Sequence, residues 1–160
     1  MNDFEILYRQ HAAELLRFAW GLCGDRSTAE DLVSETFVRL LVRAPRIETR
    51  TALAYLLAVV RNTYLTGQRR RRREVPLDED LPSPARDLCG DLDQQTRLET
   101  VLRALDDLSE GERAALLLRV DHNLSYEDIA AALAISIAAA KVRVHRARLR
   151  LASALDEQGR

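Results

Sequence analysis

Apolar residues recur at steps of three and four positions along most of the chain, the spacing that places them on one face of an α-helix. The first stripe predicts a helix over residues 3–22 and comprises Phe4, Leu7, Tyr8, His11, Leu15, Phe18 and Leu22. The second begins near Ser27, ends at Ala44-Pro45, and comprises Ala29, Leu32, Val33, Phe37, Leu40 and Leu41. The third begins near Thr51 and comprises Leu53, Leu56, Leu57, Val60 and Leu65. The first half of the chain is therefore expected to form a helical unit.

The second half of the chain carries shorter helical patterns. One stripe comprises Leu98, Val101, Leu102, Leu105 and Leu108, and Ser109-Glu110-Gly111-Glu112 then opens a helix that runs to about Val120. In such a capping box the serine hydroxyl and the glutamate carboxylate bind backbone N–H groups at the helix start. Ser27-Thr28-Ala29-Glu30 has the same form, so it predicts the start of the second helix.

A helix-turn-helix is predicted between Ser125 and Arg150. Asp121-His122-Asn123 forms a turn before it, because asparagine tolerates the left-handed conformation of helix exits. Ser125 then caps a short helix that ends near Leu133. The final helix starts after Ser136 and reaches about Leu155.

The outer face of the final helix is basic at its edges and partly apolar at its centre. At 100° per residue, the core face comprises Ile137, Ala140, Val144, Ala147 and Leu151, and the opposite face centres on Ala138, Val142, His145, Arg146 and Leu149. Lys141 and Arg148 flank one edge, and Arg143 and Arg150 flank the other. Such a helix suits a DNA major groove, where flanking cations meet phosphates and central residues face base edges. Arg146 is suited to guanine, and Ala138 or Val142 to thymine methyls. A solvated basic helix is the simpler alternative, and the apolar Val142 argues against it.

Composition and charge support an all-α protein of two small helical domains. Ala, Leu and Arg are abundant, and long alternating runs of β-branched residues are nearly absent. The net charge of −1 conceals a separation, because residues 51–73 carry six arginines and no acid. Residues 74–95 carry seven acids, three prolines and a glycine, so they are interpreted as a flexible acidic linker. The expected domains are residues 1–73 and 96–160, the second containing the helix-turn-helix.

Catalysis, metal binding and membrane insertion are not indicated. The three histidines and two cysteines lie in no triad, metal-ligand or phosphate-loop spacing, and no cofactor is expected. Two isolated cysteines are consistent with reduced thiols in a cytoplasmic protein. The sequence shows no signal peptide and no membrane span.

Four segments in series resemble motifs of bacterial RNA polymerase sigma factors of the extracytoplasmic-function (ECF) group. They are AEDLVSETFVRL (29–40), LLAVVRNTYLTGQRRRRRE (56–74), LSEGERAALLLRVDHNLSYEDIAAAL (108–133) and AKVRVHRARLRL (140–151). The acidic linker lies between the second and the third, and the resemblance covers nearly the whole chain. It implies an alternative sigma factor, which joins core polymerase and directs initiation at particular promoters.

The resemblance also implies partners and residue roles. The first domain should bind the β′ clamp helices of core polymerase through Asp31, Ser34, Glu35 and Arg39. It should melt the promoter −10 element with Arg61, Asn62, Arg69, Arg70 and Arg71, with a base pocket supplied by the loop 43–50. The last domain should read −35 DNA with Ala138, Lys141, Val142, Arg143, His145 and Arg146, and contact the β flap. The linker should thread into the polymerase channels, and a separate anti-sigma factor should regulate the chain.

The chain departs from the family pattern at a few positions. Ala134 stands where a glycine is usual in the helix-turn-helix, and Ala138-Ala139-Ala140 replaces Gly-Thr-Val. Val142 replaces a small polar residue, and Tyr55 stands at the place of a frequent tryptophan. These changes remove hydroxyl contacts, so they put the −35 sequence in question. Two alternatives therefore stay open: a sigma-like protein that titrates an anti-sigma factor, and a free-standing helix-turn-helix regulator.

Overall fold

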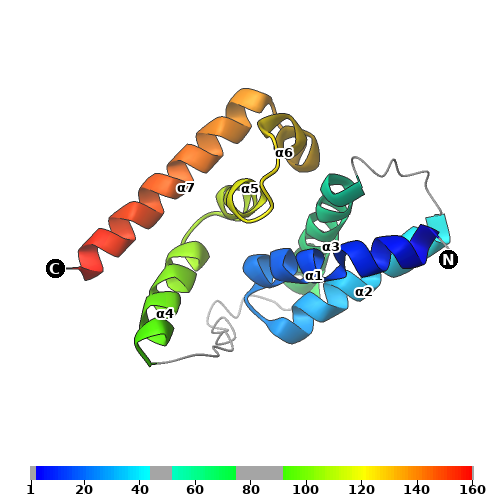
Figure 1. The fold of residues 1–160 in the computed structure, drawn as a ribbon, viewed down its shortest axis with the longest axis horizontal. Helices are drawn as coiled ribbons and strands as arrows, with labels where there is room; N and C mark the ends of the chain where they lie inside the picture. The colour runs from blue at the N-terminus through cyan, green and yellow to red at the C-terminus, as the bar shows by residue number, and fades with distance from the viewer. Residues whose placement is uncertain (1–2, 44–51, 75–91, 160) are drawn as a thin grey trace. The chain divides into compact units, whose positions relative to one another are not determined.

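The computed structural model describes residues 3–43, 52–74 and 92–159, and every regular element in these ranges is a helix (Figure 1). The all-α prediction is confirmed. The chain divides into two compact units, Met1–Ala85 and Arg86–Arg160. Most of the predicted linker, together with the loop 44–51, lies outside the described residues.

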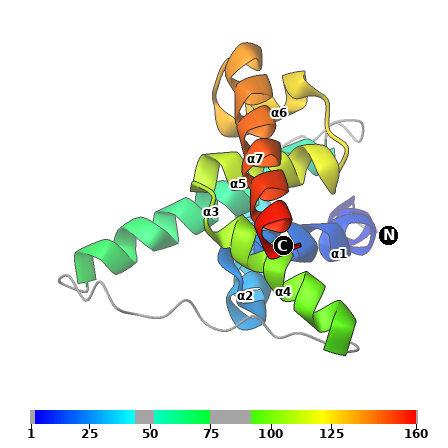
Figure 2. The same cartoon turned by 90° about the vertical axis from the view of Figure 1, so that its left-hand side faces the viewer.

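The N-terminal unit consists of α1 (Asp3–Cys23), α2 (Arg26–Arg43) and α3 (Ala52–Glu74), and each of the three contacts the other two. α1 and α2 run antiparallel, joined at Gly24, whose φ of 75° suits a residue without a Cβ (Figures 1 and 2). The largest fully buried side chains of this unit are Leu15, Phe18, Leu22, Leu56, Leu57 and Val60. The Phe37 ring meets Phe4 and Tyr8 edge-on, with centroids 5.7 and 4.9 Å apart. The predicted stripes thus form one core.

The start of α2 differs from the sequence prediction. The capping residue is Asp25 rather than Ser27, because Oδ2 of Asp25 accepts hydrogen bonds from the backbone N–H of Thr28 (3.0 Å) and from its hydroxyl. Glu30 forms an ion pair with Arg26, the first residue of the helix, at 3.2 Å. Asp25 is the better cap because its carboxylate takes two bonds at once and carries a negative charge at the helix N-terminus.

Asp25→Asn is expected to make the stability of the N-terminal unit less sensitive to acid. The bonds from Thr28, with the nearby Arg71 contributing, hold the pKa of the Asp25 carboxyl below its usual value. Because the folded-state pKa is depressed, the ionised carboxylate stabilises the fold above the ordinary aspartate pKa of about 3.9, and this contribution is lost as the pH falls below it. Asparagine still accepts the Thr28 N–H but lacks the negative charge, so the variant should be slightly less stable than the wild type at pH 7 and closer to it at pH 3. Urea unfolding followed by the fluorescence of Trp20, at pH 7 and pH 3, measures the difference, and identical pH dependence would contradict the assignment.

The C-terminal unit consists of α4 (Leu92–Asp106), α5 (Glu110–Val120), α6 (Tyr126–Leu133) and α7 (Ile137–Gln158). α7 packs against the other three helices, and α5 also packs against α6. The fully buried side chains at the centre include Leu118, Ile129 and Val144. α4 begins inside the predicted linker and α3 ends at Glu74, so both helices extend one turn or less into residues 74–95.

Several residues of the predicted apolar stripes are exposed. Their exposed fractions are 50% for Tyr8, 54% for Leu41, 37% for Leu98 and 44% for Ile137. Ile137 is the first residue of α7, and Leu41 lies in the last turn of α2. Periodicity identifies the side of a helix that faces a neighbour, but it does not say how far along the helix that neighbour extends.

Candidate functional sites

The helix-turn-helix forms as predicted, with serine caps on both of its helices. Oγ of Ser125 accepts from the N–H of Asp128, and Oγ of Ser136 accepts from the N–H of Ala139, both at 3.1 Å. Between the helices Ala134 adopts the left-handed conformation (φ 54°, ψ 47°), as Asn123 does before them (φ 53°). Three small or branched residues of α7, Ala140, Val144 and Ala147, are at most 1% exposed. This close packing fixes α7 relative to α6.

Ala134→Gly is expected to stabilise the C-terminal unit by about 1 kcal/mol. A left-handed conformation costs an L-residue with a Cβ roughly 1–2 kcal/mol, and glycine avoids most of this cost. Ala131→Gly is the matched control on the same helix, because its helical backbone should make the same exchange destabilising by about 1 kcal/mol. Urea unfolding followed by circular dichroism compares the two variants. Destabilisation by both substitutions would show that the turn carries no strain.

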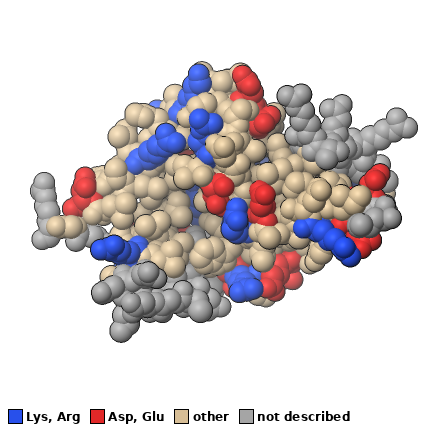
Figure 3. Space-filling model, viewed as in Figure 1, with Lys and Arg blue, Asp and Glu red and all other residues tan. Residues whose placement is uncertain are grey.

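The outer face of α7 presents most of the predicted −35 residues to solvent. Ala138, Lys141, Val142, His145 and Arg146 are all exposed. Lys and Arg side chains gather over the N-terminal half of α7 in the view of Figure 3. Exposed cations around an apolar centre give this face both phosphate-binding groups and groups that can contact base edges.

Arg143 and Arg150, predicted to flank one edge of that face, lie at the edge of α7 that contacts α5. Nη1 of Arg150 forms an ion pair with Oε2 of Glu112 at 3.0 Å, and the Glu112 side chain is 10% exposed. A methyl group on Gly111 would lie 2.5 Å from Nη1 of Arg143, so this guanidinium covers the first turn of α5. Glu112 was predicted to complete the capping box of Ser109. Ser109 does accept from the N–H of Glu112 at 3.3 Å, but the carboxylate goes to Arg150.

A cluster that the sequence pattern does not predict lies on the other edge of α7. The guanidinium carbon of Arg119 lies 4.5 Å from the centroid of the Tyr126 ring, and Nζ of Lys141 lies 5.8 Å from it. Arg119 also donates to the carbonyl of Leu124 at 2.9 Å. The Tyr126 ring therefore holds cations from α5 and α7 beside one another through cation–π contacts. The spacing of residues along the chain could not predict this cation–π cluster, because its members come from three helices.

The basic end of the N-terminal unit is the last part of α3, which continues unbroken through the arginine run to Glu74. Arg69, Arg70 and Arg71 are exposed, as is Asn62, whereas Arg61 is half-buried. The structure therefore places Asn62 two turns before the arginines on the same helix. The predicted base-pocket loop after Arg43 lies outside the described residues.

The outer face of α2 is both acidic and apolar. Asp31, Ser34 and Glu35 are exposed as predicted. Two apolar residues of the same helix that were not among the predicted site residues, Val38 and Val42, are 57% and 80% exposed. A helix with a single buried apolar stripe would have no such exposed residues. Val38 and Val42 therefore extend the apolar surface of α2 beyond the side that packs into the core.

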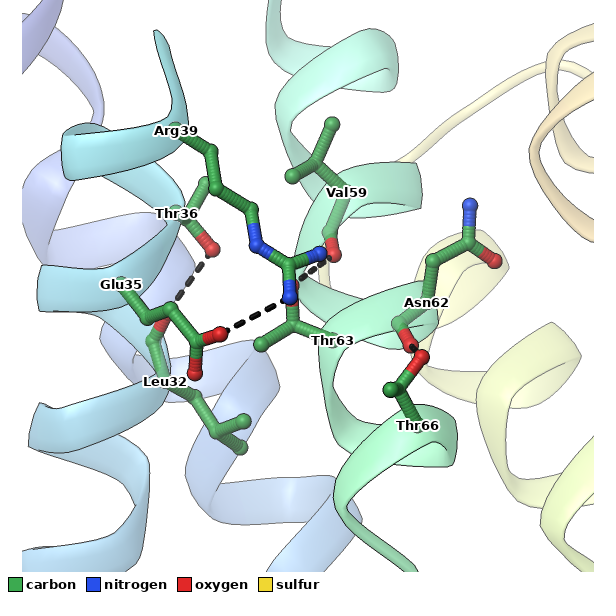
Figure 4. Close-up of polar contacts among 8 residues, drawn as sticks. All are labelled: Leu32, Glu35, Thr36, Arg39, Val59, Asn62, Thr63 and Thr66. Atoms are coloured by element: carbon green, nitrogen blue, oxygen red, sulfur yellow. Dashed lines mark hydrogen bonds and ion pairs between the residues drawn. The ribbon is translucent and has the colours of Figure 1, made fainter. Parts of the chain in front are cut away.

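Arg39, the fourth predicted residue of this face, lies differently. Its Nη2 bonds Oε1 of Glu35 at 2.8 Å, and its side chain reaches from α2 toward α3 (Figure 4). There it lines an open cavity of about 90 Å³ with Leu40, Arg43, Tyr55, Val59 and Asn62. On the same two helices the buried hydroxyls of Thr36 and Thr63 donate to the carbonyls of Leu32 and Val59, both at 2.8 Å. Arg39, predicted to face polymerase, and Asn62, predicted to face DNA, thus line the same cavity.

Within the described residues, no three histidine, cysteine or acidic side chains are grouped so that they could hold a metal ion. None of the described helices is long and apolar enough to cross a membrane.

Two helical units, one with a basic helix-turn-helix and one with an arginine-rich helix end, define a DNA-binding transcription protein. Residues 7–74 match the family model for Sigma-70 region 2, and residues 98–151 match the model for Sigma-70 region 4. The chain belongs to the ECF group of RNA polymerase sigma factors.

Individual relatives show the same relationship. The chain is 37% identical over 148 residues to the ECF RNA polymerase sigma factor EcfG of Rhodopseudomonas palustris (strain TIE-1), covering 91% of this chain and 81% of that protein. It is 35% identical over 157 residues to the ECF RNA polymerase sigma factor SigE of Mycolicibacterium smegmatis, covering 94% of this chain but only 61% of that relative. Among solved structures, the sigma factor RpoE in complex with the anti-sigma factor NepR from Bartonella quintana has a TM-score of 0.78 and 30% identity, with 98% of each chain covered.

Proposed function

We propose that this chain is an alternative sigma factor that binds core RNA polymerase, reads −35 duplex with α7 and opens the −10 element with its N-terminal unit. The observation that carries the proposal is the presence, on two units of one chain, of the exposed basic face of α7 and the exposed basic end of α3. A free-standing helix-turn-helix regulator would need only the first of these surfaces. The corresponding domains are residues 1–73 and 96–160, with 74–95 as the linker.

For the −35 element we infer that some residues of α7 contact bases and others contact phosphates. The exposed centre of the face, Ala138, Val142, His145 and Arg146, meets base edges, and Lys141 meets the phosphate backbone. Arg143 is proposed to contribute to the site from its place over α5, where it supports the position of the helix. The alanines and Val142 supply apolar contacts that favour thymine methyl groups, since they offer no hydroxyl to a base.

For the −10 element we infer that Asn62 reads the separated strand and that Arg61, Arg69, Arg70 and Arg71 hold its backbone. Arginine side chains follow a phosphate backbone without regard to sequence, whereas an amide offers a donor and an acceptor to a base edge. The exposed Asn62 side chain and the exposed arginines on one helix support this assignment.

For polymerase we infer that the outer face of α2 binds the β′ clamp helices and that the C-terminal unit contacts the β flap. Asp31, Ser34 and Glu35 provide polar contacts, and Val38 and Val42 add apolar area that a partner would bury. The resemblance implies Arg39 for this face too, but its side chain reaches toward α3 and lines the cavity there.

We further propose that an anti-sigma factor regulates the chain, and that the chain acts in the cytoplasm without catalysis or a cofactor of its own. The relative RpoE was solved bound to the anti-sigma factor NepR. A protein that covers the exposed faces of α2 and α7 would block polymerase and DNA at once. A sigma-like protein that only titrates an anti-sigma factor is the second candidate, favoured by the loss of hydroxyl groups on α7.

Transcription in vitro separates these functions. The purified chain, bacterial core polymerase and a randomised promoter library should give transcripts from templates that share −35 and −10 elements. A folded sample that binds core polymerase but never selects a promoter would favour the titrating protein. A sample that binds duplex DNA without binding polymerase would favour the free-standing regulator.

A further inference from the structure

The Arg39 side chain is less exposed than those of Arg9 and Arg26, two other arginines of the N-terminal unit that form ion pairs one turn away. Arg9 and Arg26 bind Glu5 and Glu30 at the same i, i+4 spacing, and their side chains are 67% and 69% exposed. The Arg39 side chain is only 36% exposed, although its partner Glu35 is 52% exposed. The difference arises because Arg39 lies against α3 and lines the cavity between the two helices (Figure 4).

The cavity has the chemistry of a nucleic-acid site. The residues that line it include two arginines, Arg39 and Arg43, together with Tyr55 and Asn62. Arginine donates hydrogen bonds and accepts none, so the cationic wall selects phosphate or the acceptor edge of a base. Tyr55 is 39% exposed and can stack on a base. A volume of about 90 Å³ admits a phosphate or a base edge, but not a whole nucleotide.

We propose that Arg39 contacts the separated −10 strand rather than polymerase, and that Glu35 is the positioning residue that holds the Arg39 guanidinium at the cavity. The inference rests on the proposed sigma function. The short Glu35–Arg39 contact removes much of the freedom of a long side chain, so less ordering entropy is lost when the strand binds. The pair also links two surfaces, because Glu35 lies on the face proposed for polymerase and Arg39 at the cavity proposed for DNA.

Two affinities measured separately test the assignment. The first is the affinity of the full chain for core polymerase; the second is the affinity of the assembled holoenzyme for a fluorescent single-stranded −10 oligonucleotide. Arg39→Ala should weaken the oligonucleotide about tenfold, in line with the loss of a charge-assisted hydrogen bond. It should leave core binding within about twofold and, if a phosphate is contacted, reduce the salt dependence by about 0.7 in log–log slope. Arg26→Ala, on the same helix but away from the cavity, should change neither affinity.

Glu35→Ala and the double variant test the positioning role. Glu35→Ala should weaken the oligonucleotide less than Arg39→Ala, and should add little once Arg39 is already alanine, because the two residues act as one unit. Additive effects would overturn the positioning role. An unchanged oligonucleotide affinity in Arg39→Ala, or a loss confined to core binding, would overturn the assignment of Arg39 to DNA. Failure of the wild-type holoenzyme to bind any −10 oligonucleotide would instead overturn the sigma function itself.

Discussion

Ile129→Ala is expected to destabilise the C-terminal unit by about 2–5 kcal/mol while leaving the N-terminal unit folded. Ile129 is fully buried on α6, which packs against α5 and α7, and truncation of such a side chain loses its burial and leaves a cavity. At the usual stability of roughly 0.05–0.15 kcal/mol per residue, a unit of this size has about 4–11 kcal/mol in total. The substitution therefore removes a large part of the stability that holds α7 in place, and −35 binding should fall with it.

The single tryptophan makes the measurement selective. Trp20 lies on α1, so its fluorescence reports the N-terminal unit alone, whereas far-ultraviolet circular dichroism reports the helices of both units. In Ile129→Ala, part of the dichroism should disappear at lower urea, with the fluorescence midpoint unchanged. Glu127→Gln, at an exposed position of the same helix, should leave both signals near those of the wild type. An equal shift of the Trp20 midpoint would contradict the independence of the two cores.

Arg146→Ala is expected to weaken −35 binding by about 1–3 kcal/mol and to relax the preference at one base pair. This is the usual cost of losing a bidentate contact between arginine and a guanine edge. Arg146 is exposed near the centre of the outer face of α7, without the contact to α5 that holds Arg150. Binding of the holoenzyme to a set of −35 duplexes, each changed at one position, measures both affinity and preference.

Arg148→Ala is the matched control for this prediction. Arg148 is also exposed on α7, but it lies at the edge of the face, where a side chain meets phosphates. Its loss should weaken all duplexes alike and lower the log–log salt slope by about 0.9. If Arg146→Ala behaves in this same uniform way, Arg146 is a phosphate contact, and its assignment to a base edge is wrong.

The sequence predicted the helices and the buried faces because both depend on local periodicity. The turn at Asn123, the cap at Ser125, the start of the final helix after Ser136 and the buried Ala140, Val144 and Ala147 all agree with the structure. Asp25 was missed because a capping box was read from Ser27 onward, although an aspartate two residues earlier offers a stronger acceptor.

What the sequence did not predict depends on contacts between helices. A helical wheel gives the direction of Cβ, but a long side chain bends toward a partner on another element. Arg150 therefore binds Glu112, which lies 38 positions earlier in the chain on α5. Arg39 reaches the cavity that Asn62 lines on the next helix for the same reason. The assignments of individual side chains to DNA or polymerase stay predictions.

Because α3 is one unbroken helix, it fixes the distance between two groups of residues in the N-terminal unit. At 1.5 Å per residue, about 10 Å of rigid helix separates Asn62 from Arg69. Successive arginines turn by 100°, so the run from Arg69 to Arg73 points all around the helix axis and attracts a phosphate backbone from any side. The distance between the arginines proposed to bind the strand backbone and the asparagine proposed to contact a base is thus set by the rise of the helix. An insertion of one residue between those positions would change both that distance and the angle of every arginine behind it.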